Sequence, residues 1–212
     1  MFVYSNFQFN PGKMMIYSAD LKRCPWVRLE DSLSISYHDE EWGVPVHQDC
    51  KHFEFLILEG AQAGLSWHTI LKRRKNYEQA FSHFDPKRIA DYDEDQMAKL
   101  LMNEGIIRNK LKIESSIVNA KHFLNIQREF GSFDQYVWQF VDGKPIQNYW
   151  KSMREIPAET KESCALSQDL KKRGFKFVGP TIMYAYMQAV GLVNDHTIDC
   201  FRHTQILNIS IY

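Results

Sequence analysis

The spacing of apolar residues along the chain is mostly that of α-helices. The run "HFEFLILEGAQAG" predicts a buried helix over residues 51–62, which Gly64 ends. Ser66 is a suitable N-cap for a second helix, because its hydroxyl can accept a hydrogen bond from a free amide of the first turn. Two helices are therefore expected to meet at the short segment between these residues.

The middle of the chain continues the helical pattern. Asp85 followed by Pro86 predicts the start of a helix that runs to Gly105, and Ser132 predicts the N-cap of a shorter helix. Six apolar residues at helical spacing are expected to form one stripe that faces the core, namely Leu111, Ile113, Ile117, Ala120, Phe123 and Leu124.

Two further helices are predicted toward the C-terminus. "SCALSQDLKKRG" reads as a helix that Gly174 closes, and "PTIMYAYMQAVG" as one with Pro180 in its first turn. Residues 146–160 have a mixed pattern and are expected to be irregular. Because strand signals are weak throughout, the fold class is predicted to be all-α.

The length of 212 residues allows one sizeable core, and we expect a single domain over residues 21–203. Residues 1–20 resemble a poorly ordered N-terminal extension, and residues 204–212 a short β-prone tail. Lysine plus arginine equals aspartate plus glutamate, at 26 each, so net charge does not indicate a polyanionic partner. Any such partner must be argued from local clusters.

The N-terminal residues lack the charged-then-apolar order of a signal peptide, and no apolar run approaches the roughly 18 residues of a membrane helix. These patterns predict a soluble, cytoplasmic protein without a membrane partner. Its cysteines contain no tight pair, and in a reducing compartment they favour metal binding over disulfides. Cys50 and Cys164 have no assigned role, and we expect both to be reduced and one or both to be buried.

A basic turn separates the last two predicted helices, where "LKKRG" is followed by "FKFVG". Gly174 and Gly179 permit positive φ or close backbone approach, and amides at the start of the second helix can point at a phosphate. The turn carries four cations that would hold a DNA backbone without reading its sequence: Lys171, Lys172, Arg173 and Lys176. An ordinary helical corner with a solvated basic face remains an alternative.

A histidine and a cysteine four residues apart, in "VNDHTIDC", would share one face of a helix. Together with a cysteine in "KRCPW" and a histidine in "SYHDEEWG" they complete a set that zinc binds tetrahedrally: Cys24, His38, His196 and Cys200. Such a site would fasten the N-terminal segment to the C-terminal helix. The alternative is two unrelated buried cysteines and two histidines with other partners.

A carboxylate interrupts the apolar helix in "FLILEG", and it is costly to bury without a partner or a role. Glu59 has aromatic residues near it in the sequence pattern, with Trp67 eight positions later and Tyr37 beside the candidate metal ligand. An acid flanked by aromatic rings suits a flat heterocycle with hydrogen-bond donors on its edge. A salt-bridged glutamate at a helix end, beside core aromatics, is the alternative.

These segments together resemble one family. "RCPW", "YHDEEWGVP", "LEGAQAGLSW" and "KRGFKFVGPTIMYAYMQAVGLVNDHTIDC" occur in the order found in the 3-methyladenine DNA glycosylase I family, over about residues 23–200. The resemblance implies a helix-hairpin-helix DNA glycosylase fold, with two helical lobes and the active site between them. It also implies one structural zinc ion that joins the N- and C-terminal segments.

The resemblance further implies what the candidate residues do. The enzyme would hydrolyse the N-glycosidic bond of 3-methyladenine flipped out of alkylated double-stranded DNA, acting as a monomer and releasing the free base. Glu59 would be the catalytic residue and would bind the base with Tyr37, Trp67 and, as a weaker candidate, Trp26. Two groups would contact DNA, a loop that fills the gap left by the base and the hairpin: Gly64, Leu65, Gly174, Lys176 and Gly179.

Most helix-hairpin-helix glycosylases carry a catalytic aspartate two residues before a histidine. Here that position is Asn194, and Asp195 is displaced by one. No lysine follows Gly179 to form a Schiff base, so the chain resembles a monofunctional enzyme that lacks the usual acid. A base methylated at N3 is cationic and leaves as a neutral molecule, so it needs no general acid. Under this hypothesis Glu59 reads the amino edge of the adenine and supplies negative potential.

Two other functions remain open on the sequence. One is a helix-hairpin-helix glycosylase with a different lesion specificity, against which the amide at Asn194 argues. The other is a non-catalytic DNA-binding module stapled by zinc, which would have no need for Glu59 among aromatic residues.

Overall fold

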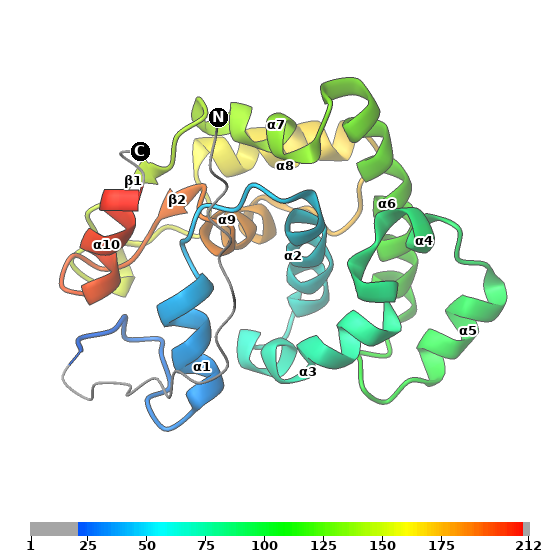
Figure 1. The fold of residues 1–212 in the computed structure, drawn as a ribbon, viewed down its shortest axis with the longest axis horizontal. Helices are drawn as coiled ribbons and strands as arrows, with labels where there is room; N and C mark the ends of the chain where they lie inside the picture. The colour runs from blue at the N-terminus through cyan, green and yellow to red at the C-terminus, as the bar shows by residue number, and fades with distance from the viewer. Residues whose placement is uncertain (1–20, 210–212) are drawn as a thin grey trace, which may run out of the picture.

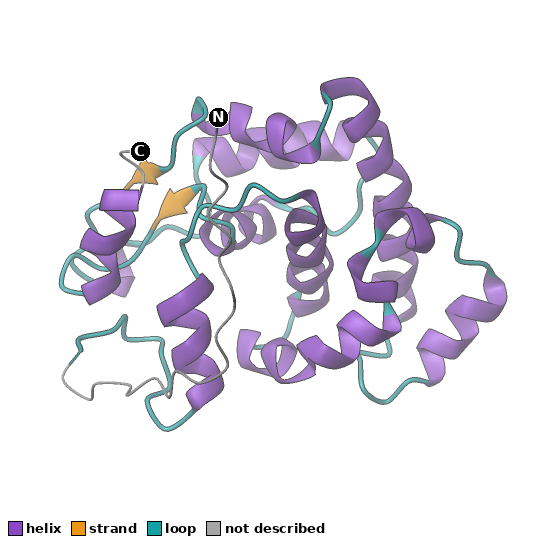
Figure 2. Ribbon diagram, viewed as in Figure 1, coloured by secondary structure: helices purple, strands orange, loops and turns teal. Residues whose placement is uncertain are grey.

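The computed structural model describes residues 21–209, and helices form nearly all of its regular structure (Figures 1 and 2). Within these residues the only sheet is a parallel pair, β1 (Ile146–Gln147) beside β2 (Val193–Asn194). The predicted all-α class is therefore confirmed at the level of a mostly helical fold. The expectations for residues 1–20, and for the last three residues of the predicted tail, lie outside the described residues.

The helices follow one another along the chain with short connections. The α-helices are α1 (Ser32–Ser36), α2 (Asp49–Gln62), α3 (Trp67–Ala80), α4 (Pro86–Ala90), α5 (Glu94–Met102), α6 (Lys110–Phe130), α7 (Phe133–Trp138), α8 (Lys161–Lys172), α9 (Pro180–Ala189) and α10 (Phe201–Ile209). A π-helical turn, η1 (Tyr37–Glu41), continues α1, and three 3₁₀ turns are η2 (Ser82–Phe84), η3 (Gln139–Val141) and η4 (Met153–Glu155).

The predicted helix starts are formed by side-chain caps. The Oγ of Ser66 accepts from the Thr69 amide at 3.3 Å, and the Oγ of Ser132 accepts from the Gln135 amide at 3.0 Å. The Oδ1 of Asp85 accepts from the amide after Pro86 at 2.9 Å. Each bond satisfies one of the amides that a helix leaves free at its start, so these predicted caps are confirmed.

Two predicted features of the middle segment are wrong. The helix expected from Pro86 to Gly105 is split, because Asp93 caps a new helix by accepting from the Gln96 amide at 2.8 Å. Leu111 is 65 % exposed rather than part of the core stripe. At about 100° per residue, Leu111 lies on the face of α6 opposite Ala120, whereas Ile113, Ala120 and Phe123 are buried.

Helix α2 lies at the centre of the molecule and is buried over most of its length (Figure 1). It packs against α3, α6, α7 and α9, so its residues are surrounded by four other helices. The α4, α5 and α6 helices lie on one side of it, and α1, α10 and the β1–β2 pair lie on the other (Figure 1). This arrangement places Glu59, near the C-terminal end of α2, between the two sides.

The C-terminal segment differs from its predicted β-prone character. Residues up to Ile209 belong to α10, and Ile206 is fully buried. The C-terminal helix thus begins before residue 204 and packs on the domain. No helix among the described residues is long and apolar enough to span a membrane.

Candidate active site and metal cluster

Four buried side chains from the two ends of the chain meet in one cluster, Cys24, His38, His196 and Cys200, with their ligand atoms all within 4.8 Å of one another. The Sγ of Cys24 lies 3.4 Å from His196 Nδ1, and the Sγ of Cys200 lies 3.4 Å from His38 Nε2. Zinc bonds of about 2.3 Å to sulfur and 2.0 Å to nitrogen give sulfur–nitrogen edges of about 3.5 Å in a tetrahedron. The cluster therefore has the donors and the spacing of a zinc site.

The histidines of the cluster are oriented by the ring nitrogens that face away from it. His38 Nδ1 lies 2.7 Å from Asp39 Oδ1, and His196 Nε2 lies 3.0 Å from the carbonyl oxygen of Trp42. Each acceptor keeps a proton on that outer nitrogen, so the inner nitrogen presents its lone pair to the cluster. This is the support that metal-binding histidines ordinarily receive.

The segment that carries His196 and Cys200 is a turn, and the expected helix there is wrong. The Cys200 amide donates to the Thr197 carbonyl at 2.8 Å, and α10 begins only at the next residue. The tight turn still brings the two ligands together, with 3.5 Å between Cys200 Sγ and His196 Nδ1.

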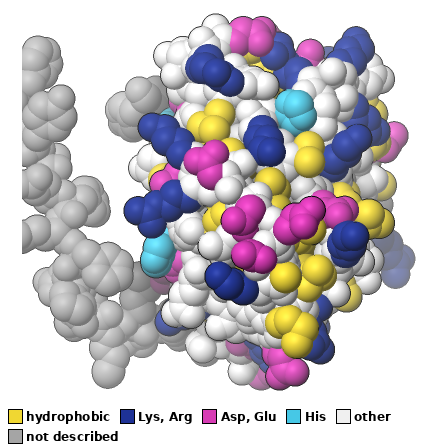
Figure 3. Space-filling model, turned by 90° about the vertical axis from the view of Figure 1, so that its right-hand side faces the viewer, with side chains coloured by type: hydrophobic (Ala, Val, Ile, Leu, Met, Phe, Trp, Pro, Cys, Tyr) yellow, Lys and Arg dark blue, Asp and Glu magenta, His cyan; other side chains and the backbone are white. Residues whose placement is uncertain are grey.

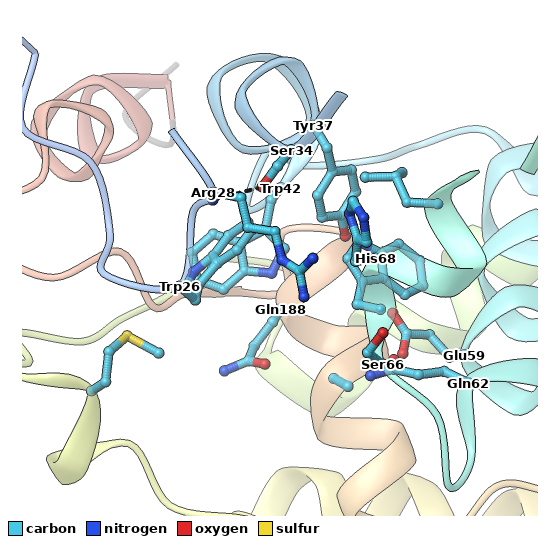
Figure 4. Close-up of a pocket in the computed structure, with 14 residues that line it drawn as sticks. Trp26, Arg28, Ser34, Tyr37, Trp42, Glu59, Gln62, Ser66, His68 and Gln188 are labelled. Carbon is cyan, nitrogen blue, oxygen red and sulfur yellow. Dashed lines mark hydrogen bonds between the residues drawn. The ribbon is translucent and has the colours of Figure 1, made fainter. Parts of the chain in front are cut away.

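Figure 4 shows the residues that line a cavity of about 320 Å³. The cavity lies beside the cluster, since its lining residues Trp26 and Trp42 contact His38 and His196. Its walls come from several elements, including the N-terminal segment, η1, α2, α3 and α9. They contain Glu59 and the three aromatic residues that the sequence suggested for base binding, Trp26, Tyr37 and Trp67. The full lining consists of Trp26, Arg28, Ser34, Tyr37, Trp42, Glu59, Gln62, Ser66, Trp67, His68, Leu71, Met153, Ala185 and Gln188.

Glu59 is a buried carboxylate whose charge is not compensated. It is 4 % exposed, and no described residue forms a hydrogen bond or an ion pair with it. Burial raises its pKa from 4.5 to about 8, because the low-dielectric surroundings disfavour the ionised form. The alternative of a salt-bridged glutamate therefore does not hold within the described residues. A carboxyl group in this state favours a cationic or donor-bearing ligand in the cavity.

The aromatic residues form a continuous wall beside this acid. The Tyr37 and Trp67 rings have centroids 5.1 Å apart, so a base cannot stack between them and must lie against them. Trp26 belongs to the opposite side of the lining and contacts Trp42, with ring centroids 5.1 Å apart. The indole nitrogens of Trp26 and Trp67 are buried and have no hydrogen-bond partner among the described residues. Both N–H groups are therefore unsatisfied in the ligand-free protein.

The segment containing Gly64 and Leu65 lies between α2 and α3, outside the lining of the cavity. Leu65 is 40 % exposed, and Gly64 has a φ of +77°. The Nζ of Lys112 supports the segment by donating to the carbonyls of Ala61 at 2.8 Å and Ala63 at 2.6 Å. An exposed apolar side chain is thereby held on a fixed loop next to Ser66 and Trp67.

The turn between α8 and α9 is fastened from within the fold. Asn119 of α6 accepts from the Lys176 amide at 2.8 Å and donates to the Lys176 carbonyl at 2.9 Å. Gly174 has a φ of +97°, and a Cβ there would lie 2.6 Å from His122, so a side chain is excluded. Gly179 has an ordinary φ of −61° and open space where its Cβ would be.

The cations of this turn are not equivalent. Arg173 is committed to acidic neighbours, since its Nη1 lies 2.6 Å from Glu129 and its Nε 2.6 Å from Asp169. Lys171, Lys172 and Lys176 are exposed and form no ion pair within the described residues. Of the four cations expected to hold a DNA backbone, only the three lysines therefore remain available. By contrast, the side of the molecule seen in Figure 3 carries charges of both signs intermixed.

Asn194 is not part of the cavity. It is fully buried, and its Nδ2 donates to Gln147 Oε1 at 2.8 Å and to the His203 carbonyl at 3.2 Å. Asp195 is 1 % exposed and accepts hydrogen bonds from four side chains, one of which, Gln188, does line the cavity. The amide at the usual acid position thus joins segments of the fold, and the neighbouring acid lies behind the cavity wall.

Several lining residues were missed in the sequence. Trp42 and Gln188 lie inside the quoted motifs, yet no spacing pattern connects residues so far apart in the chain. Arg28, Gln62 and His68 are polar residues that carried no distinguishing signal. The expectation that Cys50 or Cys164 is buried is wrong, because Cys50 is exposed and Cys164 is half-buried. Both are free thiols.

The fold and the cavity together define a helical protein with a buried carboxyl group in an aromatic-lined cavity, next to a Cys₂His₂ cluster. The family model described as methyladenine glycosylase matches residues 26–203, and the chain belongs to this family.

Similar proteins agree with this assignment. The DNA-3-methyladenine glycosylase 1 of Escherichia coli is 48 % identical over 180 residues, which are 85 % of this chain and 96 % of the relative. A crystal structure of a 3-methyladenine DNA glycosylase I superposes with a TM-score of 0.83 at 52 % identity and covers 85 % of this chain and 98 % of its own. A Staphylococcus aureus 3-methyladenine DNA glycosylase I, solved to explain 3-methyladenine recognition, has a TM-score of 0.79 at 34 % identity and covers 81 % and 92 %.

Proposed function

We propose that this chain is a DNA-3-methyladenine glycosylase that hydrolyses the N-glycosidic bond of 3-methyladenine in alkylated DNA. The observation that carries the proposal is the uncompensated carboxyl of Glu59 inside an aromatic cavity. Proteins whose names state this activity match nearly the whole chain. The cavity volume of about 320 Å³ suits a single purine base.

The charge of the substrate determines how the site works. Methylation at N3 makes the adenine cationic while it is bonded to the sugar, and a base flipped into the cavity brings that charge beside Glu59. The cation restores the ionised form of Glu59, and the carboxylate accepts hydrogen bonds from the amino edge of the ring. Glu59 in this proposal binds and orients the base, and it does not attack the sugar.

The aromatic wall discriminates by shape and by electrostatics. Tyr37 and Trp67 present two adjoining ring faces tilted by 45° to each other, and a cation is attracted to such a face by its quadrupole. Trp26 also lines the cavity, and its ring centroid lies 6.2 Å from that of Tyr37. The buried position of Glu59 also strengthens its electrostatic contact with the base.

The glycosylase holds duplex DNA through two parts of the surface. The turn from Gly174 to Gly179, with Lys176 and the N-terminal amides of α9, contacts phosphates. Gly64 and Leu65 form the loop that enters the duplex where the base has left, since Leu65 is exposed and its loop is fixed by Lys112. Supporting this, α8 and α9 pack together as a helix–turn–helix pair.

Zinc is the cofactor that the cluster fits, and Cys24, His38, His196 and Cys200 would hold it. The ion would supply a fixed link between the N-terminal segment and the turn before α10, with no part in bond breaking. All four ligands are protein side chains and are buried, which is the arrangement of a closed structural site.

The lining of the cavity supports a monofunctional enzyme, because no lysine belongs to it among the described residues and a Schiff base needs a lysine amine. The proposed enzyme acts as a monomer, since one chain supplies the whole lining. We also propose that it acts in the bacterial cytoplasm, on the DNA of the nucleoid.

The direct test is release of free bases from DNA treated with a methylating agent, followed by chromatography. We expect 3-methyladenine to be released by the protein and not by buffer alone. Release of other alkylated bases in its place would assign a different lesion specificity. A non-catalytic DNA-binding module would release none, and calorimetric titration with free 3-methyladenine would then show no binding.

A further inference from the structure

Asp195 is a buried carboxylate held by four neutral donors. Its Oδ1 accepts from Asn148 Nδ2 at 2.7 Å and from Trp150 Nε1 at 2.8 Å. Its Oδ2 accepts from the Tyr184 hydroxyl at 2.5 Å and from Gln188 Nε2 at 2.7 Å. Such a carboxylate is fixed in position, because each oxygen has two hydrogen bonds from different segments.

This carboxylate determines which way the Gln188 amide points. The Nε2 of Gln188 donates to Asp195 Oδ2, so the NH₂ group of Gln188 faces Asp195. The carbonyl oxygen Oε1 is therefore left for the cavity, which Gln188 lines. Tyr184 stands one helical turn earlier on α9 and binds the same carboxylate oxygen, so the helix face itself is held against Asp195.

Gln188 and Glu59 lie on different sides of the cavity (Figure 4). The amino group and the glycosidic nitrogen of adenine are likewise at opposite ends of the purine. With Glu59 on the amino edge, which is the arrangement of the proposed function and on which this inference rests, Gln188 faces the end of the base that is attached to the sugar.

We propose that Gln188, oriented by Asp195, is a catalytic residue that positions the attacking water at the anomeric carbon of the flipped nucleotide. Its Oε1 accepts a hydrogen bond from that water and directs a lone pair of the water oxygen toward C1′. Asp195 is a positioning residue, because it acts only through Gln188. Gln188 and Asp195 lie near Asn194, the position at which most helix-hairpin-helix glycosylases carry a catalytic aspartate.

The reaction needs no base stronger than solvent. The water oxygen bonds to C1′ while the bond from C1′ to the purine nitrogen breaks. The bonding electron pair moves onto the cationic purine, which leaves as neutral 3-methyladenine. One proton of the attacking water passes to bulk water, and the other stays on the new hydroxyl at C1′. An amide oxygen suffices for this step, since it must orient the water but need not keep its proton.

The test compares single-turnover release of 3-methyladenine from methylated DNA with the equilibrium affinity for the free base. Gln188→Met keeps the length of the side chain and removes Oε1. We expect the single-turnover rate to fall by about tenfold or more, while the affinity for free 3-methyladenine changes by less than about twofold. Asp195→Asn should likewise lower the release rate without changing the affinity for the free base. Its side-chain amide can donate a hydrogen bond to Gln188, and the Gln188 amide would then turn around.

Gln79→Met is the matched control, since it makes the same change at an exposed glutamine of α3 that does not line the cavity. It should release the base at nearly the wild-type rate. Wild-type release rates in Gln188→Met, or an equal loss of rate and of free-base affinity, would overturn the inference. A melting curve shows whether Asp195→Asn folds. If it does not, the rate and the free-base affinity of Gln188→Met decide whether the inference holds. A wild-type protein that releases no 3-methyladenine contradicts the proposed function instead.

Discussion

The Nδ1 of His38 lies 2.7 Å from Oδ1 of Asp39, the residue that directly follows it. That carboxylate is itself held by Arg23, whose Nε and Nη2 donate to it at 3.0 and 2.7 Å. An arginine, a carboxylate and a histidine thus form a chain that ends at the metal cluster. Because Arg23 precedes Cys24, the chain also ties the first cluster segment to the second.

Asp39→Ala should weaken zinc retention by about 10- to 100-fold, because His38 loses the acceptor that fixes its ring and tautomer. The measurement is zinc content after dialysis against a graded series of chelator concentrations. Glu40→Ala is the control, since Glu40 is exposed and next in the sequence. Equal zinc retention in the two variants would show that Asp39 does not support the site.

Removal of zinc should lower stability before it affects the chemistry. The cluster joins segments near residues 24, 38 and 196–200, and without the ion two thiols and two imidazoles remain buried together. We expect a chelator to lower the melting temperature, and Cys24→Ser to do so without a chelator. Cys50→Ser, which changes an exposed thiol, should match the wild type. A melting temperature that is indifferent to chelation and to Cys24→Ser would argue against a structural ion.

The stability of the ligand-free protein should fall as pH rises from about 4.5 to about 8, through the contribution of Glu59. Burial raises the folded-state pKa of Glu59 to about 8, so in this window the folded protein keeps a proton that the unfolded chain releases. The expected slope is about 1.4 kcal/mol per pH unit, and Glu59→Gln removes it.

The measurement is the difference in unfolding free energy between Glu59→Gln and the wild type, by urea titration at several pH values. Taking a difference cancels the contribution of the histidines. The variant should become progressively more stable than the wild type toward pH 8, yet bind free 3-methyladenine more weakly. Glu40→Gln is the exposed control. Two parallel stability curves would mean that Glu59 titrates as it does in the unfolded chain.

Much of the site was accessible from the sequence because its chemistry is carried by rare residue types. A glutamate inside an apolar helix and a Cys₂His₂ set are visible without coordinates, and both occur in the structure as Glu59 and the buried cluster. The local starts of helices were also predictable, because a cap such as Ser66 acts within three residues.

Other features depended on contacts between distant segments. Gln188 has no unusual neighbours in sequence, and its significance comes from Asp195 and from the opening toward the cavity. The turn at His196 was mistaken for a helix because a spacing of four residues also fits a tight turn whose ends are held by other segments. Arg173 looked free for DNA until Glu129, 44 residues earlier in the chain, was found beside it.

Arg74 should be the main residue that holds the aromatic wall in position. Its Nη1 and Nη2 both donate to Glu41 at 2.8 Å, and its Nε donates to Glu54 at 2.7 Å, so it joins α3 to η1 and α2. These three elements carry Trp67, Tyr37 and Glu59. Arg74→Lys loses the fork geometry, and we expect a cost of about 2 kcal/mol by urea unfolding.

The same variant should bind free 3-methyladenine more weakly, because the ring wall and the acid lose their common anchor. Lys72→Ala, an exposed change on the same helix, is the control for both measurements. If Arg74→Lys is less stable but binds free 3-methyladenine with wild-type affinity, the ion pairs of Arg74 stabilise the fold and do not position the cavity residues.

Gly191→Ala should be among the most damaging single changes to the fold. Gly191 has a φ of +72°, and a Cβ there would lie 2.4 Å from the backbone nitrogen of Pro45 and from the carbonyl carbon of Val44. The segment from Gly43 onward runs directly alongside α9 and its end, since the Val46 amide donates to the Val190 carbonyl at 3.0 Å. The backbone on both sides is fixed, so neither can yield to the new methyl group.

Gly143→Ala provides the matched comparison, because Gly143 has the same φ of +72° with nothing within 4 Å of the added Cβ. It should lower the free energy of unfolding by about 1 kcal/mol, because alanine disfavours the left-handed conformation. The excess for Gly191→Ala then measures the collision alone, and melting curves of the two variants give it directly. Because the displaced segment follows Trp42, whose carbonyl orients His196, the Gly191 variant should also lose zinc at lower chelator concentrations. Similar melting temperatures for the two variants would mean that the two segments separate freely.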